Sequence, residues 1–513
     1  MTAENPQQQR TERALTALSL AFAFGIFAFA GTMGLVRSYV AAVIVALSVA
    51  AFIAWIFWRH PILPYEEEAV SRALKVVSGV ATLAALLQLA RLCVFTVNAA
   101  AVGYAIGPLR GATLPITHSC ESAYFVAAQS VPTVPDVYSE ELYSLASERP
   151  DAIRKPKRIG SFNVDVYEYP IPFLLLPRAL EILAPDFLHF RMIWFALNGA
   201  VVLGGLLAVV RVIGPVAGTR ALLLSPLIFA SDQMLSTLQI GNLQAMVIAL
   251  AMLAMVFLAR HRYLIGGALL AYAILSKLFP GVLLVYLLVR RQWRALTWTV
   301  GLCAGLVVAS LLDTGLTPYH AFVSHVPRLL GGEAFPAFRN PLGIAKNYSV
   351  PGMVFKLHLF GLPGTSFVAM KIVGWIYTLI ALAATVVLAR QTRNRDEQPI
   401  VWLAILILGS LRSPFLPMYA VLPALWLLTL LAATAAPTAK RLCVVLLAWL
   451  MLNAAIPQLN PDPRLISIAI LVPQAIMVVL VVLAFGHQPE SSDAETLGEK
   501  HRVLADKTAS EPA

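Results

Sequence analysis

The sequence predicts an all-α integral membrane protein that crosses the bilayer many times. Hydrophobic residues make up 59% of the 513 residues, whereas charged residues make up only 13%. A soluble globular chain is about half apolar and about a quarter charged. A larger soluble core cannot absorb this excess, because cores stop growing as chains lengthen and divide into domains. Lipid must therefore surround most of the surface.

Apolar runs of spanning length recur along the chain, since about 17–25 helical residues cross the hydrocarbon core of a bilayer. The long runs lie at 14–36, 39–58, 74–97, 187–210, 220–237, 243–259, 294–312, 366–389, 414–433, 440–456 and 465–485. Shorter apolar stretches lie near 263–275, 279–289 and 399–412. Together they predict roughly 12–14 transmembrane helices. The first run is too long for the core of a cleavable signal peptide, so we expect a membrane helix there.

Positive charges between the apolar runs predict the orientation. The formal net charge is +11, but basic residues occur singly or in short clusters, so we expect no nucleic-acid partner. The clusters fit cytoplasmic flanks of membrane helices: Arg260/Arg262, Arg290/Arg291/Arg294, Arg390/Arg393/Arg395 and Lys440/Arg441. This orientation requires that 171–184 does not cross. It also requires that 263–289 forms a hairpin of two half-length helices, broken at Lys277–Pro280 because proline interrupts a helix.

The same topology divides the chain into four parts. We expect a cytoplasmic segment at 1–13, additional N-terminal membrane helices at 14–98, a membrane core at 99–485 and a disordered cytoplasmic tail at 486–513, where apolar residues are scarce. Two long segments, roughly 99–170 and 313–365, fall outside the membrane on the non-cytoplasmic side, and the first is expected to carry amphipathic helices. Loops of such length are usually functional or disordered.

Two cations at predicted membrane depth are candidate anion-binding groups, because charge buried in hydrocarbon is costly without a partner or a cavity. Lys277 lies in an apolar stretch just before the predicted helix break, where its ammonium would hold a phosphate. The alternative is that Lys277 snorkels to the interface or pairs with a carboxylate. Arg412 lies at the predicted outer end of a helix, and its guanidinium suits bidentate phosphate binding. An interfacial anchor is the alternative for Arg412.

The external segments carry further candidate residues. Glu121 precedes a short stretch of helical character, and a carboxylate against an apolar face can act as a general base, although most loop glutamates are simply solvated. Gly241, Asn242 and Gln244 open a helix on the outer side, where amide groups can bind phosphate or sugar hydroxyls. Asn242 also suits a simple helix cap. Tyr169 is expected at headgroup level as an interface anchor.

Other carboxylates and possible metal ligands give weaker signals. Asp232 lies near the outer end of its run and rivals Glu121, while Asp165 and Glu168 precede Tyr169. The four cysteines have no paired spacing, and Cys120 falls in a loop without an evident partner. None of the nine histidines has the i, i+4 spacing of a metal site. The sequence therefore indicates no metal, no cofactor and no disulfide.

Five short motifs, in order, resemble those of the membrane glycosyltransferases of family 87, which belong to the GT-C superfamily. The segment Leu238–Gln244 resembles a motif that opens a helix in that family, and Lys277–Pro280 with Arg290–Arg294 resembles the K-x-F-P sequence and the basic cluster that follow. Three further segments resemble later or flanking motifs: Tyr167–Pro170, Asn347–Ser349, and Ser413–Phe415 with Tyr419 and Leu422–Pro423. The resemblance covers roughly residues 100–435. It implies the GT-C fold, with the helices at 14–36 and 39–58 as an addition.

The resemblance also implies an activity. The family's proposed base is a carboxylate four positions before an aromatic residue, which corresponds here to Glu121 ahead of Phe125, with glutamate in place of the usual aspartate. Transfer of a hexose, mannose in particular, is implied from a polyprenyl-phosphate donor to a lipid or glycan acceptor, with inversion, at the periplasmic or outer face of the cell membrane. The implied donor-binding residues are Lys277, Arg412, Gly241, Asn242, Gln244, Tyr169, Asn347 and Ser413.

Two alternatives to this activity remain open. A transporter or flippase of a lipid-linked sugar would use the same cations to bind phosphate without needing a base. A catalytically inactive relative is the other alternative, because glutamate replaces the aspartate that the resemblance leads one to expect. Loss of glycosyl transfer in Glu121→Gln with donor binding retained would favour the enzyme over both.

Overall fold

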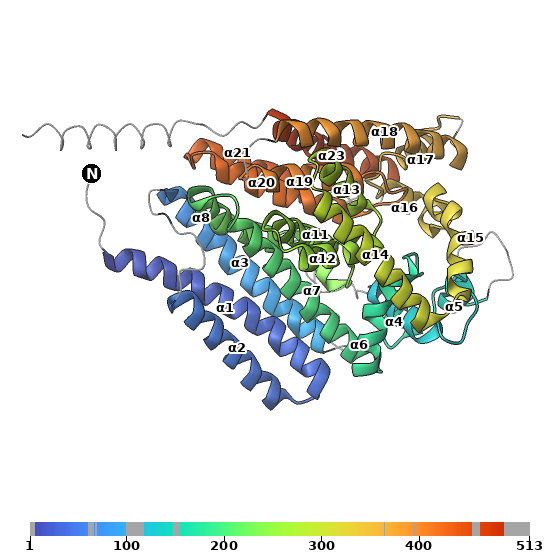
Figure 1. Cartoon of the computed structure of the whole chain (residues 1–513), viewed down its shortest axis with the longest axis horizontal. Helices are drawn as coiled ribbons and strands as arrows, with labels where there is room; N and C mark the ends of the chain where they lie inside the picture. The colour runs from blue at the N-terminus through green and yellow to red at the C-terminus, as the bar shows by residue number, and fades with distance from the viewer. Residues whose placement is uncertain are drawn as a thin grey trace, which may run out of the picture.

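The structure is a computed structural model that describes residues 6–59, 66, 69–98, 117–146, 154–363, 365–392, 396–453 and 462–486. The predicted tail at 486–513 therefore lies outside the described residues, apart from its first residue, as does part of the first external segment. The described chain is a bundle of helices with one small sheet (Figure 1). The predicted all-α class is confirmed.

Seven helices of the described chain are long and apolar enough to cross a membrane. They are α1 (Pro6–Val36), which spans from Ala14, α2 (Tyr39–Arg59), α3 (Arg72–Val97), α7 (Phe187–Val210), α14 (Trp293–Thr314), α18 (Phe367–Gln391) and α23 (Pro463–Gly486). Each begins and ends close to a predicted apolar run. The protein is therefore a multi-pass membrane protein.

Three short helices are together apolar enough to span but bend by 59° at a break, as in a broken span or a re-entrant loop: α8 (Pro215–Leu224), α9 (Pro226–Phe229) and α10 (Asp232–Gln239). Shorter apolar helices make up most of the rest: α11 (Gln244–Ala259), α12 (Tyr263–Ser276), η4 (Phe279–Gly281) with α13 (Val282–Val289), α19 (Gln398–Ser410), η6 (Met418–Val421) with α20 (Leu422–Thr434), and α21 (Ala439–Leu452). The helix break predicted at Lys277–Pro280 is confirmed, because α12 ends at Ser276 and Pro280 lies in the short helix that follows.

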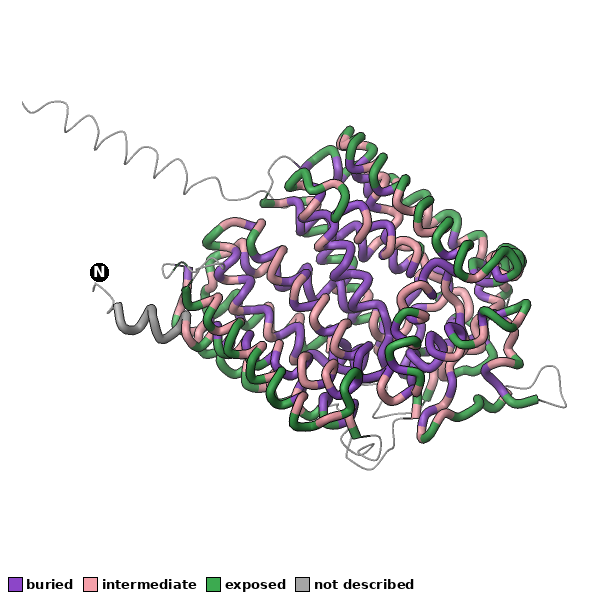
Figure 2. Tube along the Cα trace, turned by 60° about the horizontal axis from the view of Figure 1, so that its bottom comes forward, coloured by how far each residue is buried: buried purple, intermediate pink, exposed green. Residues whose placement is uncertain are grey.

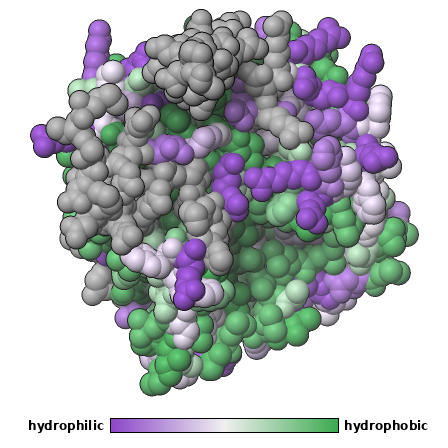
Figure 3. All heavy atoms as spheres, turned by 60° about the vertical axis from the view of Figure 1, so that its left-hand side comes forward, coloured by the Kyte–Doolittle hydropathy of each residue, from purple (hydrophilic) through white to green (hydrophobic). Residues whose placement is uncertain are grey.

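Burial separates the core helices from those that face lipid. Figure 2 shows buried residues through the middle of the bundle and exposed residues along its outer helices. Almost every residue of α11, α19 and α20 is buried, whereas α2 and α18 expose many large apolar side chains. At the end where α1 begins, hydrophobic side chains also cover much of the face, with hydrophilic ones gathered across its middle and upper part (Figure 3). Lipid accounts for this exposure of apolar surface.

The short elements of the two predicted external segments gather at one end of the bundle, on the right in Figure 1. They comprise β1 (His118–Ser119), α4 (Glu121–Ser130), α5 (Glu140–Tyr143), β2 (Arg158–Ile159), β3 (Phe162–Val164), η3 (Ile171–Leu174), α6 (Leu175–Leu183) and, from the second segment, α15 (Thr317–Gly331), η5 (Pro336–Arg339), α16 (Pro341–Ala345) and α17 (Met353–Leu359). The sheet order is β1-β3-β2, with β1 parallel to β3.

The segment predicted not to cross consists of η3 and α6. Together they span 171–183, about 20 Å of helix at 1.5 Å per residue, which is shorter than a hydrocarbon core of about 30 Å. α6 buries Pro177 and Leu180 and exposes Ile182 and Leu183. This amphipathic helix is consistent with one that rests on the membrane surface.

Candidate active site

Three segments that are distant in the sequence meet beside the end of α12. Backbone hydrogen bonds hold the first two together: β1 pairs with β3, and the amide of Cys120 donates to the carbonyl of Ile240 at 2.7 Å. Ile240 begins the turn between α10 and α11, which contains Gly241 and Asn242. The third segment is the break after α12, where Lys277 lies. The turn therefore stands between the first external segment and the helix break.

Lys277 is held by uncharged groups. Its ammonium donates to Gln244 Oε1 at 2.8 Å and to Asn242 Oδ1 at 3.4 Å. The ammonium also lies 4.8 Å from the ring centroid of Tyr419 and 5.7 Å from that of Tyr169, within the range of cation–π attraction. Among the residues that the structure describes, none provides a carboxylate at ion-pair distance from Lys277. This half-buried cation is therefore available to an anion.

The turn at Gly241 needs glycine for two reasons. Its φ is +65°, a left-handed conformation that side chains with a Cβ rarely adopt. A Cβ at this position would also overlap the carboxylate of Glu121. The carbonyl of Gly241 accepts a hydrogen bond from Trp194 Nε1 at 2.8 Å, which anchors the turn to α7. The close approach brings Asn242 and Gln244 to Lys277 and explains the glycine without any contact to a ligand.

Glu121 is placed behind this turn. Its side chain is 1% exposed, and Oε1 lies 3.0 Å from Nε of Arg191, which is equally buried. Burial raises the pKa of Glu121 to about 7, although the nearby Arg191 and the Ser119 hydroxyl act in the opposite direction. A carboxyl with that pKa suits general-base chemistry near neutral pH. With only 1% of its side chain exposed, however, Glu121 is not accessible to a substrate in this structure.

Arg191 has several partners besides Glu121. Its Nη1 donates to the carbonyls of Phe95 and Thr96 at 3.1 and 3.2 Å. Its guanidinium carbon lies 4.4 and 4.6 Å from the ring centroids of Phe95 and Phe162. The ion pair thus joins α4 and α7 to the end of α3, and it serves the structure whether or not Glu121 also reacts.

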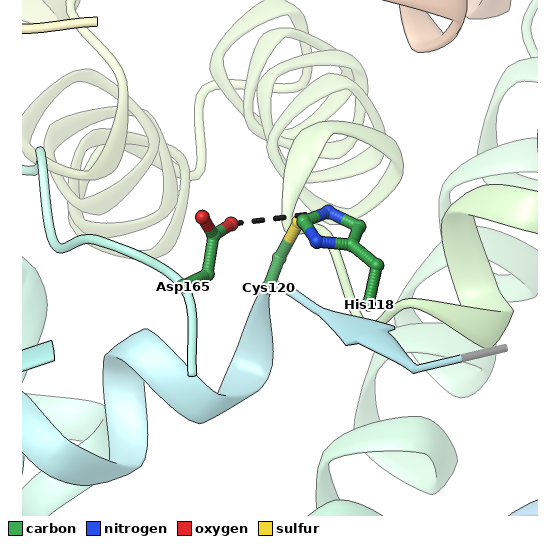
Figure 4. Close-up of side chains that lie close together, drawn as sticks. All are labelled: His118, Cys120 and Asp165. Carbon is green, nitrogen blue, oxygen red and sulfur yellow. Dashed lines mark hydrogen bonds and ion pairs between the residues drawn. The ribbon is translucent and has the colours of Figure 1, made fainter. Parts of the chain in front are cut away.

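Three side chains beside the Gly241 turn were not brought together by sequence reasoning. Cys120, next to Glu121, accepts a hydrogen bond from Asn242 Nδ2 at 3.3 Å, and its sulfur lies 3.5 Å from His118 Nε2. Asp165 Oδ2 lies 3.9 Å from His118 Nε2. Figure 4 shows the three side chains converging at the start of α4. Cys120 is a free cysteine, and its neighbours come from β1, the residue that follows β3 and a distant turn.

The side chains of Cys120 and Glu168 have shifted pKa values. Burial raises the pKa of the Cys120 thiol well above its usual value, and the nearby carboxylate of Asp165 raises it further. Burial likewise raises the pKa of Glu168, again with a contribution from Asp165. Local sequence gave no signal for this group of side chains, because Asp165 follows Cys120 by more than 40 residues and only β1–β3 pairing brings them together.

The aromatic residues of this region form one packed group. Tyr124 donates from its hydroxyl to that of Tyr169 at 3.2 Å, and the backbone amide of Leu243 donates to Tyr124 at 3.3 Å. Tyr124 and Phe173 pack edge to face, with ring centroids 5.1 Å apart. Tyr169 therefore holds a fixed place beside Lys277, as part of a rigid wall. Neither Tyr124 nor Tyr419 was predicted as a site residue, although Tyr419 belongs to the last recognised motif.

Three predicted donor-binding residues belong to other contacts. Asn347 is fully buried: its Nδ2 donates to the carbonyl of Pro414 at 2.9 Å, and its Oδ1 accepts from the amides of Ser349 and Leu416. Ser413 donates to the carbonyl of Phe415 at 2.8 Å. These bonds hold the segment that leads to Tyr419, so Asn347 and Ser413 support the wall beside Lys277 indirectly.

Arg412 contacts α18. Its Nε donates to Thr378 Oγ1 at 2.6 Å, and its guanidinium lies 5.8 Å from the ring centroid of Trp375. Asp232, the rival carboxylate, is buried and its backbone amide donates to Asn453 Oδ1 at 3.0 Å. The structure thus brings Tyr169, Asn242 and Gln244 to Lys277, with Gly241 behind them. It gives Arg412 and Asp232 other neighbours.

The fold defines a polytopic membrane protein in which Lys277 lies among amide and aromatic side chains at a break between helices. Residues 167–414, slightly less than half of the chain, match the family model of Glycosyltransferase family 87. The match supports a glycosyltransferase. It includes Tyr169, Lys277 and Arg412 but not Glu121 or Cys120. Neither the curated proteins nor the solved structures contain a significant match to this chain.

Proposed function

We propose that the protein transfers a hexose, mannose in particular, from a polyprenyl-phosphate donor to a lipid or glycan acceptor outside the cytoplasm. The availability of Lys277 carries this proposal: a half-buried ammonium held by amide oxygens and aromatic rings, with no carboxylate partner among the described residues. An ammonium in this setting attracts the phosphate of a lipid-borne sugar more strongly than it would in water. The matched family accounts for the glycosyl transfer itself.

The sidedness of the proposal follows from α12. This helix begins at Tyr263, beside the basic residues Arg260 and Arg262, and ends at Ser276, beside Lys277. Its 14 residues place these two ends about 21 Å apart at 1.5 Å per residue. Basic clusters mark the cytoplasmic side, so Lys277 belongs to the opposite side, in the cell (plasma or inner) membrane. A donor lipid already within the bilayer can then place its phosphate at the helix break.

The reaction requires one bond to form and one to break. The acceptor hydroxyl oxygen attacks the anomeric carbon of the sugar from the face opposite the phosphate, and the configuration inverts. The bond from that carbon to the phosphate oxygen breaks, so the polyprenyl phosphate leaves with the electron pair. Lys277, with Asn242, Gln244 and Tyr169 around it, stabilises the developing charge. The acceptor proton passes to a carboxylate, which the sequence resemblance assigns to Glu121.

The assignment of the base calls for a comparison of two carboxylates. The side chain of Glu121 is 1% exposed, whereas the side chain of Asp165 is 38% exposed. Glu121→Gln and Asp165→Asn therefore test the two positions. Because Glu121→Gln also leaves Arg191 unpaired, its loss of activity counts as catalytic only when Glu121→Gln/Arg191→Met folds and remains inactive.

The main experiment measures transfer directly. Purified protein is incubated with a panel of polyprenyl-phosphate hexoses and crude acceptor lipids, and released polyprenyl phosphate is quantified. Loss of one charge-assisted contact of about 1.5–3 kcal/mol predicts a fall in kcat/KM of about 10- to 150-fold for Lys277→Met. Lys277→Arg retains part of the activity, and Lys440→Met, exposed at the start of α21, serves as the control. Translocation of donor without any glycosidic product would support a flippase instead.

A further inference from the structure

His118, Cys120 and Asp165 place one nitrogen, one sulfur and one carboxylate oxygen within 4.8 Å of one another (Figure 4). We propose that these three side chains bind a zinc ion beside the turn that contains Gly241 and Asn242. Zinc is the metal favoured by a mixed imidazole, thiolate and carboxylate set, because it accepts all three ligand types in a tetrahedral site. This proposal does not depend on the proposed glycosyl transfer, since metal binding is measured without any substrate.

The distances between the ligand atoms fit a tetrahedral zinc. Bonds of about 2.3 Å to sulfur and about 2.05 Å to nitrogen place those atoms about 3.5 Å apart at the tetrahedral angle. The observed separation of Cys120 Sγ and His118 Nε2 is 3.5 Å. The corresponding separation of nitrogen and carboxylate oxygen is about 3.3 Å, and His118 Nε2 lies 3.9 Å from Asp165 Oδ2. Zinc binding therefore requires Asp165 Oδ2 to approach His118 Nε2 by about 0.6 Å.

The backbone holds the three ligands in place. In the parallel pairing of β1 with β3, His118 lies opposite Asn163 and Ser119 opposite Val164, so Asp165 emerges next to Cys120. The amide of Asp165 also donates to Ser122 Oγ at 2.9 Å. Together with the hydrogen bond from the amide of Cys120 to Ile240, these contacts fix the ligand backbone on both sides. Little conformational freedom remains to be lost when a metal binds.

The charges of the set balance those of the metal. A Cys120 thiolate and the Asp165 carboxylate together carry two negative charges, which neutralise Zn²⁺ while His118 binds as neutral imidazole. Asn242 Nδ2 already donates to the Cys120 sulfur at 3.3 Å, a contact that stabilises a thiolate ligand. The charge of Lys277 therefore remains available for an anion, even though Asn242 also contacts its ammonium at 3.4 Å.

The cluster is open on one side. The side chain of His118 is 56% exposed and that of Asp165 is 38% exposed, whereas Cys120 is buried beneath them. Three protein ligands with one open position are typical of catalytic zinc sites, whereas structural sites use four. The fourth position takes a water or an oxygen of a bound anion. Because Asn242 contacts both Cys120 and Lys277, the cluster lies close to the ammonium of Lys277.

The test measures metal rather than activity. Full-length protein in detergent, with its affinity tag removed, is stripped with a chelator and titrated with Zn²⁺ alone, and bound metal is measured by elemental analysis. We expect one zinc per chain. Substitution with Co²⁺ is expected to give the near-ultraviolet charge-transfer band of a cobalt–thiolate bond. Zinc is also expected to raise the midpoint of thermal unfolding of the wild type.

Variants identify the ligands. Cys120→Ser abolishes the cobalt–thiolate band, and Cys120→Ser, His118→Gln and Asp165→Asn each weaken zinc binding by more than about 100-fold, the upper range for loss of a mere outer-shell contact. Cys443→Ser and His358→Gln are the matched controls, since both lie elsewhere in the chain. The side chain of Asp165 is 38% exposed, so Asp165→Asn tests the zinc site if the buried substitution Cys120→Ser prevents folding. Absence of zinc from the wild type, or equal affinity in the ligand variants, would overturn the proposal.

Discussion

The buried ion pair between Glu121 and Arg191 leads to a quantitative prediction about stability. Both side chains are 1% exposed, and Glu121 Oε1 lies 3.0 Å from Arg191 Nε. The substitution Arg191→Met keeps an unbranched side chain of similar length but removes the charge. The substitution leaves the carboxylate of Glu121 buried without its counter-ion. The turn at Gly241 is already packed closely against that carboxylate.

The expected loss is large for a single residue. Removing one partner of a buried ion pair costs about 3–5 kcal/mol. The Coulomb attraction at the observed 3.0 Å has a similar size, about 5.5 kcal/mol at an effective dielectric constant of about 20. Two carbonyls, those of Phe95 and Thr96, also lose a donor. In Glu121→Gln/Arg191→Met no charge remains buried, so we expect the double variant to be more stable than the sum of the single losses by about 2–3 kcal/mol.

Unfolding of the purified variants in mixed micelles, followed by circular dichroism, measures these differences. Arg37→Met is the control, because Arg37 and Asp186 form an ion pair of 2.9 Å in which both side chains are about half exposed. Such a pair contributes about 0–1 kcal/mol. Strict additivity of the two substitutions, or an Arg191→Met loss no larger than that of Arg37→Met, would refute the buried pair.

Four further predictions concern Gly241, Glu121, Lys277 and Asn347. Gly241→Ala places a Cβ against the Glu121 carboxylate and forces a side chain into a positive φ, so the unfolding midpoint falls further than in Gly204→Ala, where the added Cβ meets nothing within 4 Å. If Glu121 is the base, its pKa of about 7 means that kcat/KM falls as the pH drops below about 7. The fall is roughly tenfold per pH unit once the carboxylate is mostly protonated, and this acidic limb of the pH profile disappears in Glu121→Gln. A limb unchanged in that variant would exclude Glu121. Lys277→Met lowers binding of a radiolabelled polyprenyl-phosphate hexose while leaving the unfolding midpoint within the range of Lys440→Met; unchanged binding would remove the ammonium from the donor site. Asn347→Ala leaves the carbonyl of Pro414 and two amides without partners, costing about 1–3 kcal/mol of stability, and a wild-type midpoint would contradict that network.

The local sequence was sufficient for the helices. The apolar runs predicted all seven helices of spanning length, because a helix in lipid must satisfy its own backbone hydrogen bonds. The predicted total of roughly 12–14 exceeds the seven, or eight with the bent pair, that are long enough among the described residues, since several apolar runs form helices of only 10–17 residues. The break at Lys277–Pro280 was predictable for the same reason, since proline interrupts the helical hydrogen bonds. A lysine at that break also stood out, because charge is rare at this depth.

The neighbours of the candidate base were not predictable in this way. Successive residues of a helix point about 100° apart, so Cys120 and Glu121 at the start of α4 face different surroundings. The structure turns Cys120 toward Asn242 and His118, and Glu121 toward Arg191. Sequence spacing alone does not predict which of two adjacent residues faces Asn242, because that depends on the orientation of α4 against α7.

The sequence by itself determined the membrane class, the positions of the helices and the cation at the break, all of which follow from interactions between near neighbours in the chain. The tertiary structure alone decided that Glu121 is paired with Arg191 and that His118, Cys120 and Asp165 converge. Those contacts join segments far apart in sequence through the β1–β3 pairing and the Gly241 turn. Their geometry depends on the packing of the whole bundle, which no local pattern encodes.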